Sequence, residues 1–573
     1  MPFDSLGEIP IVFAVTGHRD IPSEDFDGLS KLISAKLKQS KTDYPDSTHV
    51  LLSCLAEGAD RIAAQAALDA GWQLGAILPM PEYEYLNDFE SSESKNEFQR
   101  LISASSFVME VSSSLRPDCY LDAGKWLCRR AQLLIALWDG KDGKVGGTAN
   151  VVKIFLEGDP KYNDSPAVPD TGLVHHIVTR RLSDPQDLHS ASPKTLSPRP
   201  AGLKLDNAGV EKKRWDEIFK HIDSWNKIHS ESKKNDGENK VGLGLYYPKS
   251  DADSTKYGEI NKKLKAKINQ NPQLKALDCL YQAADKLSYE AQEKRKSRFK
   301  IIILFGALAI LMQQLYSSAF PYPVTMCIAI ASGLLSYGLY WKSQRSKLEE
   351  RYIHYRGLAE ACRVQFFWIL IGCKDDVTDH FLFAQRNALE WIRQAISTIA
   401  FYENPTTANT LADVNLVKDT WIEDQFNYFI GNTNKAKKHA DDGRKFDNCT
   451  KYLIWIGLFL YVAVLFVHIF MGESLIPILN LVCGLALAVA ALFNIWNETM
   501  AHNEHATRYE RSGLLFAIAD ERLDAAIKGH GIEPGLKLAL AQEIIYKTGK
   551  EALDENSDWV LLHQQRPVKA PVG

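Results

Sequence analysis

Hydrophobic residues follow one pattern in the N-terminal part of this chain and a different one in the C-terminal part. In the N-terminal part they form short apolar runs, most of them separated by segments with helical spacing. The runs lie at 11–15, 49–53, 74–79, 106–111, 133–138 and 173–178. Strands that alternate with helices in this way predict an α/β domain with a Rossmann-like parallel sheet.

Two long apolar hairpins, 301–341 and 452–496, dominate the C-terminal part. Apart from Glu473 in the second turn, neither hairpin contains Asp, Glu, Lys or Arg. A helix needs about 20 apolar residues to cross a hydrocarbon core about 30 Å thick, and each hairpin is long enough for two such helices. The pattern therefore predicts a mostly α-helical membrane region with four transmembrane helices. The expected spans are about 301–319, 324–341, 452–471 and 475–496.

Polar segments between these patterns set the expected domain boundaries. Ser, Pro and Asp between 183 and 206 predict loop, and 228–256 predicts a flexible excursion. Helical spacing returns at 257–300, where a long helix is expected to run from about Leu274 into the first span. The expected units are a Rossmann-like domain (1–182), a loop-rich linker with helices (183–273), a first two-span unit (274–371), a cytoplasmic helical connection (372–432) and a second two-span unit with C-terminal helices (433–573).

The two hairpin units share an order of features, which favours an internal duplication. A basic helix precedes each hairpin, and the helix that follows carries an Arg-Tyr pair and a Gly-Leu pair. These pairs are Arg351-Tyr352 with Gly357-Leu358, and Arg508-Tyr509 with Gly513-Leu514. Small residues at four-residue separations also recur, and they predict close helix contacts within or between protomers. They are Ala329, Gly333, Ser332 and Ser336 in the second span, and Gly484, Ala488, Ala486 and Ala490 in the fourth.

Charge and cysteine content limit the classes of function. The net charge of −4 argues against nucleic acid as a partner, because duplex binding requires many Lys and Arg to neutralise phosphates. The nine cysteines show no CxxC spacing, which fits a reducing compartment. Basic residues flank both hairpins, and basic loops stay on the cytoplasmic side. We therefore expect a multi-pass protein of the inner (cytoplasmic) membrane, with its soluble domain in the cytoplasm.

Three motifs follow predicted strands, where parallel sheets bind their ligands. Each contains a glycine that allows close backbone approach, and two of them open a helix whose N-terminus favours anions. The predicted ligand-binding residues are Thr16, Gly17, His18 and Arg19 after the first strand, Glu57, Gly58, Asp60 and Arg61 after the second, and Asp139, Gly140, Gly146, Gly147 and Thr148 after the fifth. Arg116 and Tyr120 are expected at the rim. Taken singly, each motif is equally compatible with an ordinary turn or helix start.

In this order, the three motifs resemble the SLOG superfamily over about residues 8–180. The segments are TGHRD, then LSCLAEGADRIAAQAALDAGWQLGAILP, then LLIALWDGKDGKVGGTANVV. The superfamily is Rossmann-like, and its relatives include the DNA-processing protein of bacterial transformation and the lonely-guy nucleotide glycosidases. The resemblance implies a domain that senses a nucleotide-derived messenger, such as a cyclic ADP-ribose isomer or a cyclic oligonucleotide, and that needs no cofactor.

The hairpin units resemble SLATT modules, which are two-span effectors associated with SLOG domains. Together the resemblances imply a membrane effector of a bacterial antiviral system, of the CBASS or Thoeris type. Such an effector oligomerises when its messenger binds, and it disrupts the membrane or opens a pore, which leads to cell death or arrest. Its functional partner would be a messenger synthase, either a TIR protein or a nucleotidyltransferase.

One departure from the family bears on catalysis. The lonely-guy glycosidases carry a PGGxGTxxE loop, whose Glu takes part in cleavage of the ribose–base bond. In this chain Val145 replaces the Pro, no Gly separates Gly147 from Thr148, and Val151 stands at the position of the Glu. The sequence therefore favours binding over hydrolysis, with no catalytic residue predicted. A membrane-tethered nucleotide or NAD hydrolase, with Glu57 as a substitute carboxylate, stays open, as does a structural scaffold.

Two polar clusters are weaker candidates, and we predict no metal site from the sequence. His502 and His505 lie one helical turn apart below the fourth span, near Glu498 and Glu504. Solvated residues on a coupling helix are the favoured interpretation of this group. A second cluster, Asp375, Asp376, Asp379 and His380, is expected to form a loop or helix start.

Overall fold

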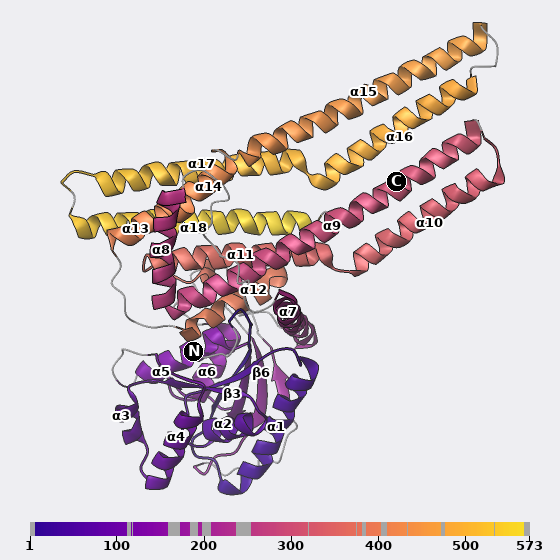
Figure 1. The fold of residues 1–573 in the computed structure, drawn as a ribbon. Coiled ribbons are helices and arrows are strands. Elements are labelled where there is room, and N and C mark those ends of the chain that lie inside the picture. Colours follow the sequence, from indigo (N-terminus) through magenta and orange to yellow (C-terminus); the bar gives the residue numbers. More distant parts are fainter. Residues whose placement is uncertain are drawn as a thin grey trace.

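A seven-stranded sheet with its helices forms one end of the molecule, and a long body of helices extends away from it (Figure 1). The structure is a computed structural model. It describes residues 6–111, 116, 118–158, 172–183, 193–197, 208–236, 254–318, 320–373, 375–380, 386–402, 410–431, 434–470, 476–531 and 533–565.

The sheet has the strand order β4-β3-β2-β1-β5-β6-β7. Its strands are β1 (Ile11–Gly17), β2 (His49–Ser53), β3 (Gln73–Leu78), β4 (Phe107–Glu110), β5 (Leu133–Trp138), β6 (Leu173–Val178) and β7 (Lys194–Leu196). All neighbours pair in parallel except β6 and β7, which are antiparallel. The central strands are buried apolar runs, as expected for a sheet that is covered on both faces. The predicted fold class is confirmed.

Helices connect the parallel strands and cover the sheet. They are α1 (Phe26–Asp43), α2 (Ala59–Asp69), the short α3 (Glu82–Tyr85), α4 (Ser92–Ala104), α5 (Asp118–Arg130) and α6 (Thr148–Glu157), with 3₁₀ turns η1 (Ser23–Asp25) and η2 (Leu86–Asp88). In α1, Leu29, Ile33 and Leu37 recur every four residues and are buried against the sheet. Right-handed crossovers place α1, α2 and α4 on one face and α5 and α6 on the other.

Two segments differ from the expected loops. β7 lies within 183–206, where Ser, Pro and Asp predicted loop; this short edge strand is held by pairing with β6. The helix α7 (Ala208–Asp236) extends into 228–256, because its buried face, which includes Trp225 and His229, packs against the protein. Residues 237–253 lie outside the described part of the chain.

The rest of the chain is almost entirely helical. Its α-helices are α8 (Ser254–Gln270), α9 (Pro272–Ser318), α10 (Pro323–Arg345), α11 (Leu348–Leu370), α12 (Arg386–Ser397), α13 (Leu411–Val417), α14 (Glu423–Phe429), α15 (Lys435–Phe470), α16 (Ile476–Met500), α17 (His502–Lys528) and α18 (Pro534–Gln565). Short connections are η4 (Val377–His380), η6 (Thr398–Tyr402) and the π-helical η7 (Lys418–Ile422). The long α9 confirms the helix expected to run from about Leu274 into the first span.

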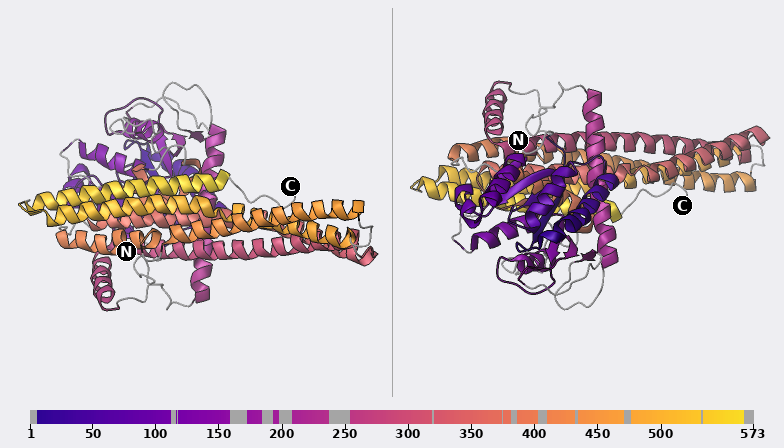
Figure 2. Two further views of the ribbon diagram at one scale, coloured as in Figure 1. Left: turned by 90° about the horizontal axis from the view of Figure 1, so that it is seen from above. Right: turned by 90° about the horizontal axis from the view of Figure 1, so that it is seen from below.

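The helices α9 and α10, and likewise α15 and α16, form two apolar hairpins that project from the body (Figures 1 and 2). Four helices are long and apolar enough to cross a membrane. Large apolar side chains cover the outside of both hairpins; Leu304 is 64% exposed and Phe459 is 73% exposed. Apolar surface on this scale needs a nonaqueous partner, and a lipid bilayer provides one. The chain has the features of a membrane protein.

The small residues of the spans pack within one protomer. The Ser336 hydroxyl donates a hydrogen bond to the Ile302 carbonyl of α9 at 2.9 Å, and Gly306 lies beside it. Between the hairpins, Gly484 of α16 lies against the Gln314 side chain of α9, where an added Cβ would come within 2.7 Å. Small residues thus bring together spans of both hairpins, as close helix packing in lipid requires.

Each hairpin ends at a residue with left-handed backbone conformation. Lys347 has a φ of 51° between α10 and α11, and Ala501 has a φ of 48° between α16 and α17. Non-glycine residues rarely adopt this conformation. The two units therefore share a helix break after the second span as well as the order of their helices.

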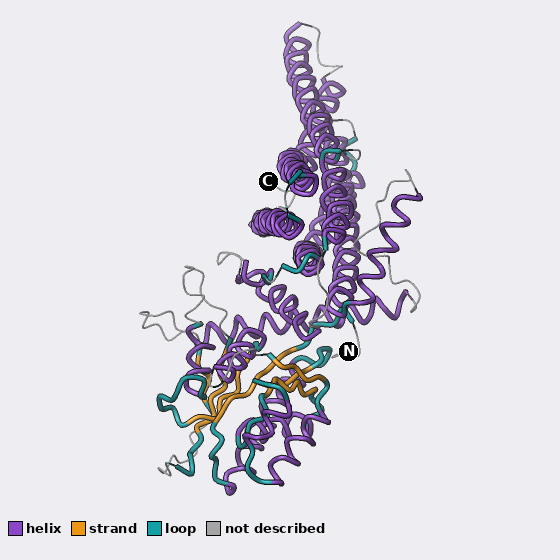
Figure 3. The backbone as a smooth tube through the Cα atoms, turned by 90° about the vertical axis from the view of Figure 1, so that its left-hand side faces the viewer, coloured by secondary structure: helices purple, strands orange, loops and turns teal. Residues whose placement is uncertain are grey.

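The helical body contacts the amino ends of the strands (Figure 3). Just before β1, the Ile9 amide donates to Asn226 Oδ1 of α7 at 2.9 Å, and Asn226 Nδ2 donates back to the Ile9 carbonyl at 2.8 Å. The Trp225 indole donates to the Gly7 carbonyl at 3.0 Å. Because β1 to β6 are parallel, their carboxyl ends lie at the opposite edge of the sheet, away from these contacts.

Candidate functional site at the carboxyl edge of the sheet

The direction of the strand order reverses between β1 and β5. Open α/β sheets bind their ligands at such a topological switch point. His18 and Asp139, the first residues after these two strands, meet at this point. The Asp139 amide donates to His18 Nε2 at 3.0 Å, and Asp139 Oδ1 lies 3.2 Å from the same nitrogen. Burial lowers the pKa of His18, and the nearby Asp139 carboxylate only partly opposes this effect. His18 is therefore neutral at pH 7, and its Nε2 accepts the hydrogen bond from the Asp139 amide.

Two predicted glycines are explained by close backbone packing. A Cβ on Gly17 would lie 2.3 Å from the Ala59 Cβ, which no side chain can tolerate. Gly58 has a φ of 75°, and a Cβ there would lie 2.5 Å from the Arg19 carbonyl oxygen. These glycines let the loop after β1 lie directly against the start of α2. Thr16 lies within β1 itself, in register with Ala136 of β5.

The N-terminus of α2 is occupied by groups of the protein itself. The Ala59 amide donates to the His18 carbonyl at 3.0 Å. The buried Asp60 carboxylate accepts hydrogen bonds from the backbone amides of Cys54 and Ala56. Burial raises the pKa of Asp60 to about 7, although these amides and Arg19 favour the charged form. Asp60 thus holds the loop after β2, and it is a supporting residue of the site.

Glu57 and Arg61 are directed toward α4. Arg61 is buried, and its guanidinium donates to the Leu55 carbonyl, to Ser94 and to Glu97 Oε2 at 3.0 Å. The Ser94 hydroxyl also donates to the Glu57 carboxylate. These contacts fix the loop after β2 on α4, so the structure places both residues in packing roles.

The N-terminus of α6 presents backbone N–H groups without a side-chain cap. Its N-cap residue is Gly147, which has no side chain to accept a hydrogen bond. The preceding Gly146 has a φ of 77°, and its amide donates to Asn150 Oδ1 at 3.1 Å, which closes the turn. Thr148, the first helical residue, adds a hydroxyl at the same point. Uncapped N–H groups at a helix start attract anions.

Tyr120 lies beside this helix start, and Arg19 lies near the Tyr120 ring. Arg19 is exposed, and its guanidinium carbon lies 5.9 Å from the centre of the Tyr120 ring. Tyr120 belongs to the first turn of α5 and lies next to Gly146, where an added Cβ would lie 3.7 Å from the Tyr120 Cβ. We name Arg19, Tyr120, Gly146, Gly147 and Thr148 the carboxyl-edge site. A cation, an aromatic ring and free N–H groups together suit a phosphate-bearing aromatic ligand.

Asp88 holds both predicted rim residues. Arg116 NH1 donates to Asp88 Oδ1 at 2.6 Å, and the Tyr120 hydroxyl donates to Asp88 Oδ2 at 2.5 Å. Burial and this hydrogen bond raise the pKa of Tyr120 to about 12. Asp88 was not among the predicted residues, because it is brought to the site from η2 only by the fold. Gly140 has a φ of 84° in the exposed turn after Asp139.

The two weaker clusters have structural partners. His439 Nδ1 of α15 lies 3.1 Å from His502 Nδ1 of α17, and the ring of His505 lies 5.5 Å from that of His439. Asp379 forms an ion pair with Arg129 at 2.6 Å, and Asp376 lies 3.7 Å from Arg130. The loop cluster therefore joins α5 of the sheet to the helical body.

No protein-family model matches the chain, and no curated protein matches it either.

Proposed function

We propose that the sheet domain binds a nucleotide-derived messenger at the carboxyl-edge site, and that the four-span region acts on the membrane in response. The observation that carries this proposal is the meeting of Arg19, Tyr120 and the uncapped start of α6 at the switch point of a sheet, in a chain with four candidate spans. The resemblance to SLOG domains and SLATT modules supports a role as the membrane effector of a bacterial antiviral system.

Each part of the site matches one part of such a ligand. The α6 N–H groups and the Thr148 hydroxyl suit a phosphate. Arg19, near the Tyr120 ring, adds a full positive charge to the site. The Tyr120 ring, whose hydroxyl is fixed by Asp88, offers a flat surface for a base. A cyclic ADP-ribose isomer and a cyclic oligonucleotide both contain these groups.

Helix α5 provides a physical route from the site to the helical body. Tyr120 in its first turn belongs to the site, and about 15 Å away the helix ends at Arg129 and Arg130, which pair with Asp379 and Asp376. Trp126 of the same helix contacts Phe401. A ligand that favours one position of α5 would shift the arrangement of the helices that cross the membrane. This shift requires different affinities for the two states.

The test uses the full-length protein in liposomes filled with a fluorescent dye. A panel of cyclic ADP-ribose isomers and cyclic oligonucleotides is screened by thermal shift, since a ligand of the folded state raises the melting temperature. The active compound is expected to release the dye. Arg19→Ala and Thr148→Ala are each expected to weaken binding by about tenfold or more, in line with the loss of a charge-assisted hydrogen bond. Lys153→Ala, at an exposed position on the same helix α6, is the matched control.

Wild-type binding and leakage in both variants would contradict the proposal. Release of free base from NAD or a nucleoside monophosphate would instead indicate the glycosidase alternative. Glu57, the carboxylate that this alternative requires, is bound by Ser94 in the structure, which favours binding over hydrolysis.

A further inference from the structure

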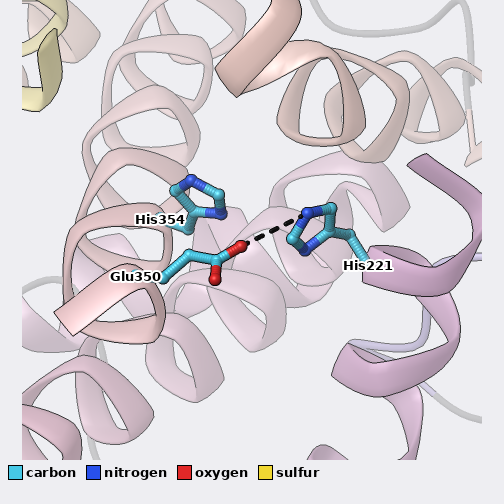
Figure 4. A group of neighbouring side chains, drawn as sticks. All are labelled: His221, Glu350 and His354. Carbon is cyan, nitrogen blue, oxygen red and sulfur yellow. Dashed lines mark ion pairs between the residues drawn. The ribbon is translucent and has the colours of Figure 1, made fainter. Parts of the chain in front are cut away.

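A second polar cluster, separate from the residues of the carboxyl-edge site, lies in the helical body (Figure 4). His221 comes from α7, whereas Glu350 and His354 come from the first turns of α11. One ligand atom from each of the three residues lies within 4.8 Å of the other two. His221 Nε2 and Glu350 Oε1 are 3.4 Å apart. The cluster thus brings two imidazoles and one carboxylate together from two elements.

The helical spacing and the packing of neighbours explain this convergence. Glu350 and His354 are four residues apart, so their side chains lie above one another on one face of α11. α7 faces this side, and the His221 and His354 rings are 5.3 Å apart. The buried His354 also accepts a hydrogen bond at Nδ1 from the Trp391 indole at 3.2 Å. This bond leaves the proton of neutral His354 on Nε2.

A cavity of about 370 Å³ opens beside the three side chains. Its lining includes charges of both signs, with Lys220, Lys347 and Arg351 against Glu217 and Glu350. The Lys347 ammonium lies 3.5 Å from Glu350 Oε2, so it competes for the carboxylate. The lining contains no cysteine. The space leaves room for a further small ligand next to the cluster.

We propose that His221, Glu350 and His354 bind a divalent transition-metal cation of the Zn²⁺ class, with an open coordination position toward the cavity. Two imidazoles and a carboxylate are the donor set that Zn²⁺ accepts when it keeps one position for water or substrate. Bonds of about 2.0–2.2 Å require the three groups to approach one another by side-chain rotation. Lys347 then leaves Glu350, because the cation takes over neutralisation of the carboxylate.

The cation would join the part of the chain next to the sheet to the part next to the membrane. α7 is bonded to the residues before β1 through Asn226, and α11 starts at the left-handed break after the second span. A metal bridge between the two helices would therefore raise the stability of this junction. It would also change the surroundings of the Trp391 indole, because His354 must give up either its hydrogen bond from Trp391 or its Nε2 proton in order to bind the cation.

The test is a metal titration of the full-length protein in detergent after treatment with EDTA. Zn²⁺ is expected to bind with one equivalent per chain and to raise the melting temperature. Co²⁺ is expected to give visible absorption bands of a four- or five-coordinate site with N and O ligands, without thiolate charge-transfer bands in the near ultraviolet. Co²⁺ should also quench part of the tryptophan fluorescence, and that part should be missing in Trp391→Phe.

Two variants localise the site. His221→Gln and Glu350→Gln should each weaken Zn²⁺ binding by at least about tenfold, whereas the exposed His530→Gln should leave it unchanged. Equal Zn²⁺ affinity in wild type and both variants would overturn the proposal. If either variant melts early without metal, the Co²⁺ spectrum and the Trp391 quenching of the wild type decide. Wild-type protein that shows neither signal also overturns it.

Discussion

Asp60 connects the chemistry of the carboxyl edge to the stability of the sheet domain. Its carboxylate is buried and is bound by the Cys54 and Ala56 amides, which shape the loop after β2. Burial raises the pKa of this group from its usual 3.8 to about 7. Between these two values the folded protein holds a proton that the unfolded chain has released. Stability contributed by protonated Asp60 is therefore present at low pH and is lost as the pH rises toward 7.

Asp60→Asn should remove this loss, because Asn is always neutral and keeps a carbonyl oxygen for the two amides. This rise in pKa corresponds to a loss of the order of 4 kcal/mol in the free energy of unfolding when the pH rises from below 3.8 to above 7. We expect the variant to melt somewhat above wild type at pH 5, where part of this stability is already lost, and further above it, by about 5 °C or more, at pH 8. Thermal melting of the full-length protein at both values measures this. A difference between the proteins that is the same at pH 5 and pH 8 would show that Asp60 does not titrate in this range.

Individual residues also show what the sequence could and could not predict about the site. Gly17 ends a strand and His18 follows it directly, so their position at the switch point is fixed by chain connectivity alone. Glu57 and Arg61 stand at a helix start in the sequence, but their side chains turn to Ser94 and Glu97. That choice depends on where α4 packs, which no local pattern encodes.

Among the elements, α5 differs from the other sheet helices because its start contributes to the carboxyl-edge site and its end contacts the helical body. Tyr120 at its start belongs to the carboxyl-edge site. At its end, the Arg129 guanidinium donates to both carboxylate oxygens of Asp379, at 2.8 and 2.6 Å. Both side chains are about one-third exposed, so this bidentate pair contributes roughly 1 kcal/mol or less. A contact of this strength can break without unfolding either element, as the proposed response to a ligand would require.

Charge reversal tests the contact between α5 and η4. Arg129→Glu places two negative charges together and should lower the melting temperature by a few degrees, and Asp379→Arg alone should do the same with two positive charges. The double variant restores an opposite-charge pair and should recover at least half of the loss, which is the coupling that a double-mutant cycle measures. Additive losses in the double variant would mean that the two residues do not interact in solution.

Sequence patterns predicted the long elements better than the short or amphipathic ones. β1 to β6 and α9 carry continuous apolar runs or helical spacing of many residues. β7 has three residues and exists only because β6 offers a free edge. The cluster of His221, Glu350 and His354 was missed for a related reason: His221 is far from the other two in sequence, and only the packing of α7 on α11 brings it to them.

At the scale of the whole molecule, the carboxyl-edge site lies at one edge of the sheet. The helical body with its membrane helices lies at the opposite edge, next to the amino ends of the strands. The sheet and the basic ends of the hairpins are on one side, and the two turns are at the far tips (Figure 1). α9 and α16 contact each other, so the four spans form one group in a single chain. Both hairpins must therefore enter the membrane from the same face, which agrees with the basic residues at their ends.

This arrangement makes a definite prediction of membrane topology. An epitope inserted after Pro321, in the turn between α9 and α10, should be accessible to antibody in spheroplasts, whose cytoplasmic membrane is intact. The same epitope inserted after Gly531, in the exposed turn between α17 and α18, should become accessible only after the membrane is permeabilised. The reason is that Lys342 and Arg345 end the second span with positive charge, which is retained inside, whereas the tip of the first hairpin carries no charge. Labelling at both positions in spheroplasts, or at neither, would contradict two hairpins that enter from the cytoplasmic face.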